Sequence, residues 1–285
     1  MLFFPGTRPD QYAKGLDSGA DVVCLDLEDA VGQADKERAR DQAVELLGGG
    51  TWLAARSAVR INRVRSDPGR RDLEALARAA DRGPDIEGAG ARGAGAMTVL
   101  LPKVDGPGEV EEAVALFADT DHDVRIVAMI ETALGLEHAM EVASAPGVVA
   151  LFIGAVDLAV ELGCAFEWEP LLYARSRVVH ASAVAGVQAI DVPFLDLRDR
   201  EGLVAEARAV ARLGFTGKAA IHPGQIEPIH EAFAPTPAEL ERAHGILEAH
   251  AHGTGGVTVF EGRMIDGPVL EAARRTIARA SEEKR

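Results

Sequence analysis

The 285-residue chain contains only two cysteines and no excess of positive charge. Cys24 and Cys164 each lie in or beside an apolar run, so we expect two free thiols in a reducing compartment, the cytoplasm. The formal net charge is −15, which disfavours binding to nucleic acid or to an anionic membrane surface. A local group of Arg and Lys side chains must therefore meet any anionic ligand.

Long apolar runs and targeting signals are also missing. No run approaches the roughly 20 residues of a transmembrane helix. The first residues, MLFFPGTRPD, carry no basic region ahead of the apolar stub, as a signal peptide would. No GxGxxG motif follows that stub, which disfavours an open dinucleotide-binding sheet. We therefore expect no membrane partner.

The chain does contain a repeated unit, in which a short apolar run precedes a polar segment of helical periodicity. The eight runs begin at Leu2, Asp21, Ala58, Met97, Val124, Val148, Val187 and Phe215. Eight strand–helix repeats predict an α/β fold, a (β/α)8 TIM barrel, with an open doubly wound sheet as the alternative. We expect the barrel over residues 1–232. Residues 233–285 should form an additional C-terminal helical segment that caps the barrel or reaches a neighbouring subunit.

Polar or charged residues close all eight apolar runs. In chain order they are Gly6 with Arg8, Glu28 and Asp29, Arg60 and Asn62, Lys103, Glu131, Asp157, Asp191 and His222. Active sites of TIM barrels lie at the carboxyl ends of the strands. We therefore expect these side chains to converge on one site.

Carboxylates dominate this group, and neighbouring carboxylates raise one another's pKa unless a cation lies among them. Hard oxygen ligands without a Cys/His cluster favour Mg²⁺ over zinc. Glu131 and Asp157 end adjacent strands and are the expected direct ligands, while Glu28 and Asp29 would hold metal-bound waters. Asp29 could instead cap the next helix. For Asp26 we expect an ion pair with an arginine inside the barrel.

Several ordered segments together resemble the citrate lyase β-subunit family of the HpcH/HpaI aldolase group, which includes malyl-CoA and citramalyl-CoA lyases. They are FFPGTRPDQYAKG, ADVVCLDLEDAV, VRIN, LPKV, IETALGL, FIGAVDLA, LGFTGKAAIHPGQI and EGRMIDGP. The resemblance implies a TIM barrel that binds Mg²⁺ and cleaves a 3-hydroxyacyl-CoA thioester. The products would be an acyl-CoA, typically acetyl-CoA, and a 2-oxo acid such as oxaloacetate, glyoxylate or pyruvate. One departure is the start MLFFPG, which lacks the Arg-Ser pair that family members usually carry there.

The resemblance also implies roles for single residues. Glu131 and Asp157 match the metal ligands, and Glu131 is expected to lie against the substrate as well. Arg60, in VRIN, matches an arginine that contacts the substrate carbonyl and carboxylate. Glu28 and Asp29 are expected to complete the catalytic group.

A basic segment near the start of the chain is expected to bind the CoA portion. Arg8 and Lys14 fall in the segment that, by the resemblance, helps to do so. Arg63 and Arg65 could extend this positive rim or could form a solvated face.

The implied reaction is a carbon–carbon cleavage through an enolate, whose carbon finally takes a proton. Asp266, in MIDGP, matches an aspartate supplied by a neighbouring subunit, and it is the candidate acid. We therefore expect a homo-oligomer, a trimer or a multiple of it. Lys103 could be a Schiff-base nucleophile, but the metal carboxylates favour a role as a charge partner. His222 shows no acidic partner in the sequence and is expected to be structural.

Two alternatives stay open. One is a carrier-dependent β subunit of a citrate lyase complex, which would act on a thioester of a carrier protein. The other is a class II aldolase of the pyruvate type, which would need no CoA.

Overall fold

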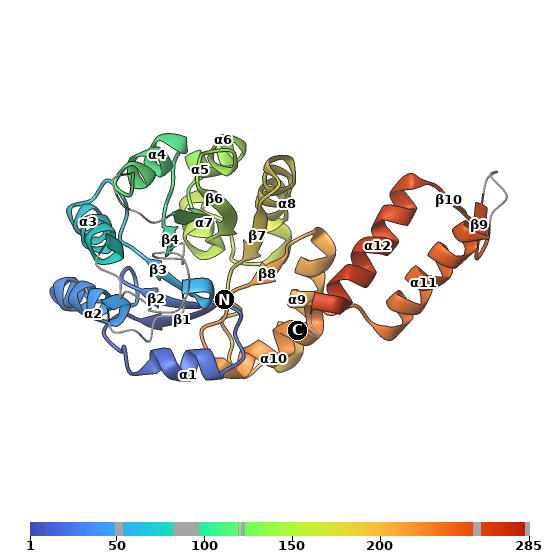
Figure 1. Ribbon diagram of the computed structural model, residues 1–285, viewed down its shortest axis with the longest axis horizontal. Helices are drawn as coiled ribbons and strands as arrows, with labels where there is room; N and C mark the ends of the chain where they lie inside the picture. Colours follow the sequence, from blue (N-terminus) through green and yellow to red (C-terminus); the bar gives the residue numbers. More distant parts are fainter. Residues whose placement is uncertain (49–53, 82–96, 119, 121–122, 253–257, 283–285) are drawn as a thin grey trace. The chain divides into compact units, whose positions relative to one another are not determined.

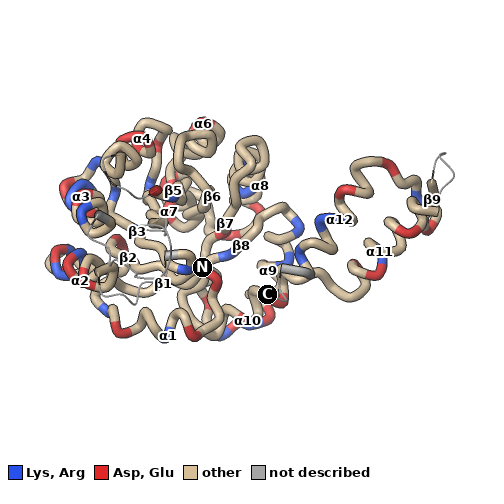
Figure 2. Tube along the Cα trace, viewed as in Figure 1, with Lys and Arg blue, Asp and Glu red and all other residues tan. Residues whose placement is uncertain are grey.

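A computed structural model describes residues 1–48, 54–81, 97–118, 120, 123–252 and 258–282 (Figure 1). The chain forms two compact units, Met1–Ile229 and His230–Arg285. Lys or Arg and Asp or Glu are mixed along the helices of both units, as Figure 2 shows for α2 and α3 in the first and for α11 and α12 in the second.

The first unit is built on one eight-stranded sheet. Its strands pair in chain order, and every pair is parallel. They are β1 (Leu2–Pro5), β2 (Val23–Asp26), β3 (Ser57–Arg60), β4 (Met97–Leu101), β5 (Val124–Ile130), β6 (Val148–Ile153), β7 (Gln188–Asp191) and β8 (Gly217–Lys218). The predicted α/β class is confirmed.

The sheet is curled, and its ladder is not continuous from β8 back to β1. β8 has two residues, and beyond it an isolated parallel bridge joins Leu2 to Ala220. Across this seam the amide of Phe3 donates to the carbonyl of Ala220 at 3.0 Å, and the amide of Ala220 donates to the carbonyl of Met1 at 2.8 Å. The sheet thus fits a TIM-like fold. The predicted barrel would be closed by a continuous hydrogen-bonded ladder between its last and first strands, and here a single bridge stands in that place.

Helices surround the curled sheet (Figure 1). They are α1 (Gln11–Asp17), α2 (Lys36–Gly48), α3 (Asp67–Asp81), α4 (Pro107–Ala115), α5 (Ala133–Glu137), α6 (Ala139–Ala143), α7 (Ala155–Leu162), α8 (Trp168–Ala185), α9 (Arg200–Leu213) and α10 (Ile226–Phe233). Short 3₁₀ turns lie at η1 (Gln33–Asp35), η2 (Ala54–Arg56) and η3 (Pro223–Gln225). None of the helices in the described ranges is long and apolar enough to cross a membrane.

The polar segment after β5 forms two short helices, α5 and α6, which meet at His138. The backbone of His138 has φ −90° and ψ 14°, outside helical values. Its Nδ1 lies 2.8 Å from the carbonyl oxygen of Asp105, which ties this break to the loop after β4.

The interior of the sheet is apolar. Small and large side chains together form a buried cluster of Cys24, Ala58, Leu100, Val127, Met129, Ala150, Phe152 and Ala219. Full burial of one large apolar side chain contributes about 1.5–3 kcal/mol. Cys24 and Cys164 are free thiols, and burial raises the pKa of the Cys24 thiol.

The second unit contains α11 (Pro237–Ala251), an antiparallel hairpin of β9 (Thr258–Phe260) and β10 (Arg263–Ile265), and α12 (Gly267–Glu282). It has its own buried cluster, formed by Ala243, Ile246, Ile265, Leu270 and Ala273. Thr236 begins α11 with a capping box, in which its side chain and that of Glu239 each bind the other residue's backbone amide.

Candidate active site

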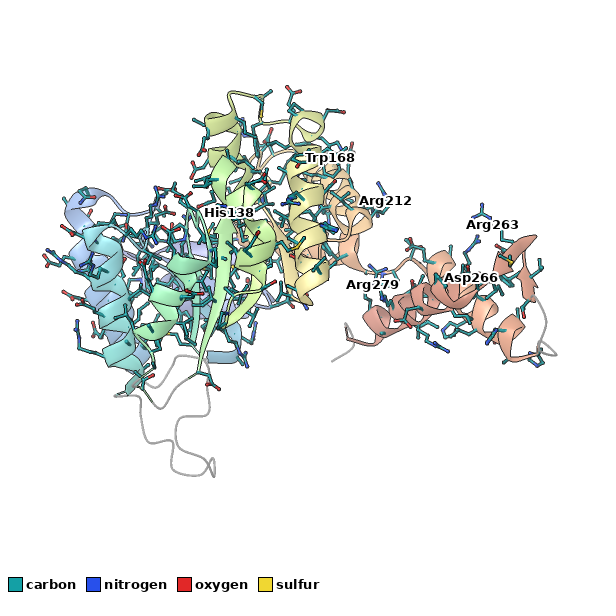
Figure 3. The ribbon with its side chains drawn as sticks, turned by 90° about the horizontal axis from the view of Figure 1, so that it is seen from above. His138, Trp168, Arg212, Arg263, Asp266 and Arg279 are labelled. Atoms are coloured by element: carbon teal, nitrogen blue, oxygen red, sulfur yellow. The ribbon has the colours of Figure 1, made fainter. Side chains whose placement is uncertain are left out.

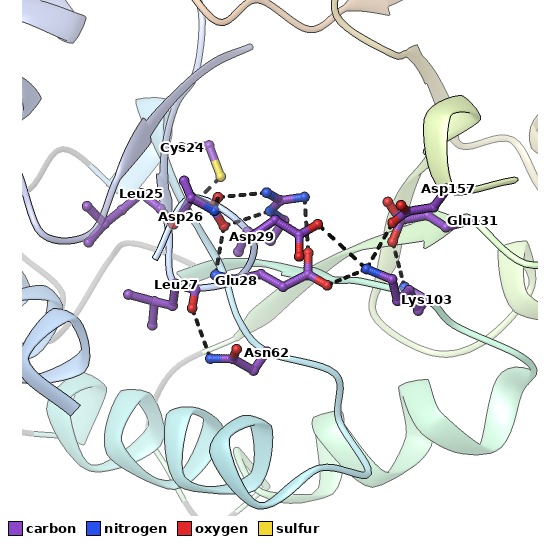
Figure 4. Close-up of polar contacts among 12 residues, drawn as sticks. Cys24, Leu25, Asp26, Leu27, Glu28, Asp29, Asn62, Lys103, Glu131 and Asp157 are labelled. Carbon is purple, nitrogen blue, oxygen red and sulfur yellow. Dashed lines mark hydrogen bonds and ion pairs between the residues drawn. The ribbon is translucent and has the colours of Figure 1, made fainter. Parts of the chain in front are cut away.

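The carboxyl ends of the central strands bring charged side chains together (Figure 4). Arg60 is the last residue of β3, Lys103 follows β4, and Glu131 follows β5 directly. Asp157 lies in the first turn of α7, just after β6. Part of the predicted convergence, from β2 to β6, is therefore present.

Arg60 and Asp26 form a fork-to-fork ion pair at the centre of this group. The Nε of Arg60 donates to Asp26 Oδ1 at 2.7 Å and its Nη2 donates to Oδ2 at 2.6 Å. Asp26 is 1% exposed and also accepts from the amides of Glu28 and Ala30. Burial opposes the charge of Arg60, but the hydrogen bonds and charge of Asp26 outweigh it and raise the pKa of Arg60. The predicted pairing of Asp26 with an arginine is present, and it fixes the guanidinium plane.

Lys103 connects three carboxylates. Its Nζ lies 2.8 Å from Glu28 Oε1, 2.9 Å from Asp157 Oδ2 and 3.6 Å from Asp29 Oδ2. Burial opposes the charge, yet the bonds to Glu28 and Asp157 raise the pKa of Lys103. A protonated amine is a poor nucleophile, so the geometry favours the predicted charge partner over a Schiff-base lysine.

Glu131 is a buried carboxylate of the site, with 4% of its surface exposed. Burial, and then the negative charge of Glu28, raise the pKa of Glu131 to about 7. The backbone amide of Lys103, which has a left-handed φ of 51°, donates to Glu131 Oε2 at 2.8 Å. Gly154 leaves room on the other side, since a Cβ there would lie 2.1 Å from Glu131 Oε1.

Gly154 was missed by sequence reasoning, although it stands inside the motif FIGAVD that predicted Asp157. Its role is visible only when β5 and β6 lie side by side. The central place of Lys103 among the carboxylates was also missed, because the sequence does not show which strand ends face one another.

The oxygen donors of this site fit a Mg²⁺ ion. Within the described ranges, no three His, Cys, Asp or Glu side chains are grouped closely enough to hold a metal alone. Mg²⁺ commonly takes one or two carboxylates and completes its shell with water and substrate oxygens. Glu28 Oε2 is buried without a hydrogen bond, 3.1 Å from Arg60 Nη1, which leaves an acceptor available at the site.

A cavity of about 400 Å³ opens beside these side chains. Its charged lining residues are Asp26, Asp29, Arg60, Glu131 and Asp157. Its apolar ones include Phe3, Met129 and Phe152 from the sheet interior. The guanidinium of Arg60 lies over the ring of Phe3, 5.3 Å from its centroid. Charged and apolar side chains therefore both line the cavity.

The basic residues predicted to bind CoA lie outside the lining of this cavity. Arg8 is exposed after β1 and pairs with a neighbouring aspartate at 2.9 Å. Lys14 is exposed on α1. Arg63 and Arg65 form ion pairs with carboxylates of the following βα unit.

Two other predicted positions lie at helix starts. His222 caps η3, where its Nδ1 accepts from the amide of Gly224 at 3.0 Å, as expected of a structural residue. Asp266 belongs to the second unit, is exposed, and accepts from the amide of Val269 at 3.1 Å before α12 (Figure 3).

Comparison with known proteins identifies relatives along the whole chain. The sequence model of the family HpcH/HpaI aldolase/citrate lyase matches residues 1–223. A citrate lyase subunit beta-like protein of Mycobacterium tuberculosis is 36% identical, over 99% of this chain and 95% of its own length. Citrate lyase subunit beta of Leuconostoc mesenteroides subsp. cremoris is 31% identical, with 99% and 92% covered. A (3S)-malyl-CoA thioesterase of Cereibacter sphaeroides is 32% identical, with 98% and 93% covered.

Solved structures of related proteins are similar to this chain as well. CitE of M. tuberculosis in complex with magnesium, acetoacetate and coenzyme A superposes with a TM-score of 0.81 at 34% identity, covering 98% of this chain and 97% of that one. The citrate lyase beta subunit of M. tuberculosis with oxaloacetate and magnesium has a TM-score of 0.68 at 34% identity, with 82% and 96% covered. A complex of CitE with magnesium and pyruvate has a TM-score of 0.73 at 31% identity, with 97% and 96% covered.

Proposed function

The chain belongs to the HpcH/HpaI aldolase/citrate lyase family, and on this basis we propose that it is a Mg²⁺-dependent carbon–carbon lyase. Its substrate is a 3-hydroxyacyl-CoA thioester of the citryl-, malyl- or citramalyl-CoA type. The products are acetyl-CoA, or another acyl-CoA, and a 2-oxo acid. The observation that carries the proposal is the group of carboxylates with Arg60 around one cavity, in a chain alignable over nearly its full length with a relative crystallised with magnesium and coenzyme A.

The proposed fold is a (β/α)8 barrel. The strand order and the bridge between Leu2 and Ala220 support it, because together they return the sheet to its first strand. The site then lies at the carboxyl ends of the strands, where such barrels hold their active sites.

The proposed reaction breaks the bond between the carbinol carbon and the carbon next to the thioester. A base takes the hydroxyl proton as the ketone forms, the electron pair of the broken bond enters the thioester as an enolate, and the enolate carbon is then protonated. Bound Mg²⁺, with Glu131 and Asp157 as its ligands, would supply a Lewis acid for the carbinol oxygen.

Arg60 is the proposed substrate contact. Two of its N–H groups bind Asp26, which leaves further donors on Nη1 and Nη2 for a substrate carboxylate or an enolate oxygen. Glu28 and Asp29 hold Lys103 at the mouth of the site, so we assign them to the catalytic group as positioning residues.

The remaining assignments concern the rest of the thioester and the final proton. We propose that Arg8 and Lys14 bind the CoA portion and that Asp266 of a neighbouring copy protonates the enolate carbon. The exposure of all three side chains supports this, since each is accessible to a ligand or to a second subunit. The assembly would be a homo-oligomer, a trimer or a multiple of it.

A second candidate function is hydrolysis of the thioester. It is favoured by the similarity to a (3S)-malyl-CoA thioesterase. The two functions differ in their products, because a thioesterase releases the hydroxy acid and free CoA, whereas a lyase releases a 2-oxo acid and leaves the thioester bond intact.

The test is a product analysis with purified protein, Mg²⁺ and four thioesters, namely citryl-, malyl-, β-methylmalyl- and citramalyl-CoA. We expect a 2-oxo acid and an acyl-CoA from at least one, with loss of activity in EDTA and in Glu131→Ala. Glu111→Ala, on an exposed position of α4, serves as the control and should keep activity. Free CoA with the intact hydroxy acid would instead support the thioesterase. Absence of turnover with all four would contradict both and point to a carrier-bound substrate.

A further inference from the structure

We propose that the cavity selects 2-oxo acids whose group beyond the keto carbon is small and uncharged, as in glyoxylate or pyruvate, over dicarboxylic oxaloacetate. The selecting surface, here called the apolar wall, consists of Val192, Pro193, Leu195 and Ile221. This inference rests on the proposed lyase function and narrows its substrate.

The first argument is the charge of the cavity. Among the described residues that line it, Arg60 is the one cation, beside four carboxylates. Arg60 already pairs with Asp26 and lies 3.1 Å from Glu28. One substrate carboxylate can be neutralised by Arg60 together with a divalent cation. A second carboxylate would enter a site that already has an excess of negative charge.

The second argument is the chemistry of the apolar wall. It comes from the loops after β7 and β8, and Phe152 and Met129 also line the cavity. A substituent that lies against these residues meets hydrocarbon. A methyl group gains from this contact, whereas an unpaired carboxylate loses its hydration there.

The third argument is that Lys218, a cation that contacts the apolar wall at Val192, has its donors already used. Lys218 has a side chain with no exposed surface. Its Nζ binds Asp191 at 2.6 Å, Glu206 at 2.7 Å and the carbonyl of Val192 at 2.7 Å. An ammonium with three acceptors has no donor left for a ligand. Lys218 thus holds the first residue of the wall and offers no charge to the cavity.

A second buried side chain fixes the rest of the wall. Gln225 is 4% exposed, and its Nε2 donates to the carbonyl of Phe194 at 2.8 Å. Its Oε1 accepts from the amide of Ile221 at 2.9 Å and from that of His222 at 3.2 Å. The two loops of the apolar wall are therefore held to each other, so the wall is preorganised to exclude a charged group.

The first test compares two thioesters that differ in one substituent. Citramalyl-CoA carries a methyl group where citryl-CoA carries a carboxymethyl group, and their 2-oxo products are pyruvate and oxaloacetate. We expect kcat/KM for citramalyl-CoA to exceed that for citryl-CoA by at least about 100-fold, since the charged substituent is left unpaired. Equal values, or a preference for citryl-CoA, would overturn the inference while the lyase function stands.

A binding measurement separates the inference from the function. Pyruvate, 2-oxobutyrate and freshly prepared oxaloacetate are titrated calorimetrically into the protein with Mg²⁺. Tighter binding of the two monocarboxylates supports selection by the apolar wall, even if no thioester is cleaved. Absence of cleavage would refute the lyase function alone. Oxaloacetate that binds as tightly as pyruvate, or no binding of any of the three, overturns the inference.

A charge variant tests the wall itself. Leu195 lines the cavity and is 49% exposed, so Leu195→Arg adds a cation without an overpacked core. We expect it to shift the ratio of kcat/KM toward citryl-CoA by about tenfold or more. Leu197→Arg is the matched control, because Leu197 is 56% exposed on the same loop but outside the lining. A ratio that Leu195→Arg leaves unchanged, or that both variants shift alike, would contradict the role of the wall.

Discussion

At the scale of single residues, the site holds more carboxylates than cations. Five acidic side chains share two basic ones, and the whole set is Asp26, Glu28, Asp29, Glu131, Asp157, Arg60 and Lys103. Arg60 and Lys103 form ion pairs with the carboxylates around Glu131. Burial, and then the charge of Glu28, nevertheless raise the pKa of Glu131.

A pH titration of stability isolates Glu131. Burial and the charge of Glu28 raise the pKa of Glu131 from 4.5 to about 7, so the native state binds this proton more tightly than the unfolded chain does. Its contribution to stability is fully present below about pH 4.5 and is lost as the pH rises through about 7. In Mg²⁺-free protein the free energy of unfolding should fall by up to about 3 kcal/mol over this interval.

The measurement is urea unfolding at stepped pH, with Glu131→Gln as the comparison because an amide does not titrate. The free energy of unfolding of the wild type minus that of Glu131→Gln should fall as the pH rises through about 7. Parallel curves across this interval would show that Glu131 has an ordinary pKa.

Gly154 gives a second prediction at this scale. Gly154→Ala places a methyl group into Glu131, since the Cβ would lie 2.1 Å from its Oε1. We expect Mg²⁺ affinity to fall at least about tenfold, because the carboxylate must rotate away from its place. Gly48→Ala is the control, because nothing lies within 4 Å of a Cβ there. The measurement is calorimetric titration of both variants with Mg²⁺. Equal affinity in the two would show that the space left by Gly154 is not needed for metal binding.

The sequence predicted individual residues unevenly. The pairing of Asp26 with an arginine could be expected, since a buried carboxylate needs a partner and VRIN supplies one on the next strand. The partners of Lys103 could not, because they come from the loop after β2 and from α7. Which strand ends face one another depends on the curvature of the sheet.

At the scale of elements, periodicity predicted the strands well and the breaks poorly. Continuous apolar runs such as the one in β5 are typical of strands covered on both faces. The split between α5 and α6 escaped prediction because the bond between His138 and Asp105 joins two distant loops. The shortness of β8 escaped it as well, since the run after Phe215 has the same pattern as the others.

The start of α11 offers a test at this scale. Thr236→Ala removes the capping box with Glu239 and should lower the free energy of unfolding of the second unit by about 1 kcal/mol. Thr236→Ser keeps the hydroxyl and should restore most of the loss. The measurement is hydrogen exchange of the α11 amides in the intact protein. If the α11 amides were as well protected in Thr236→Ala as in the wild type, the capping box would not contribute to the stability of the second unit.

At the scale of the whole molecule, the chain divides into a unit with the cavity and a unit with Asp266. The family resemblance predicted that Asp266 acts on a neighbouring copy. That assignment stays a proposal, and it leads to an experiment that needs two inactive proteins.

Asp266→Ala and Glu131→Ala should each abolish turnover, with Mg²⁺ binding nearly intact in the first. When the two are dissociated, mixed and reassembled, sites that combine an intact cavity with an intact Asp266 should recover part of the wild-type rate. The control is each variant reassembled alone. No recovery in the mixed oligomer, or full activity of Asp266→Ala, would place the acid elsewhere.

The seam between β1 and the chain after β8 has a consequence for how the protein is made. Every other neighbouring pair of strands joins segments that leave the ribosome one after the other, so those pairs can form during synthesis. β1 finds its second neighbour only when Ala220 has emerged. Until then the nascent sheet has two unpaired edges and an exposed apolar interior. We therefore expect a pause in translation after Ala220 has left the ribosome to favour folding, and a pause before that point to favour aggregation.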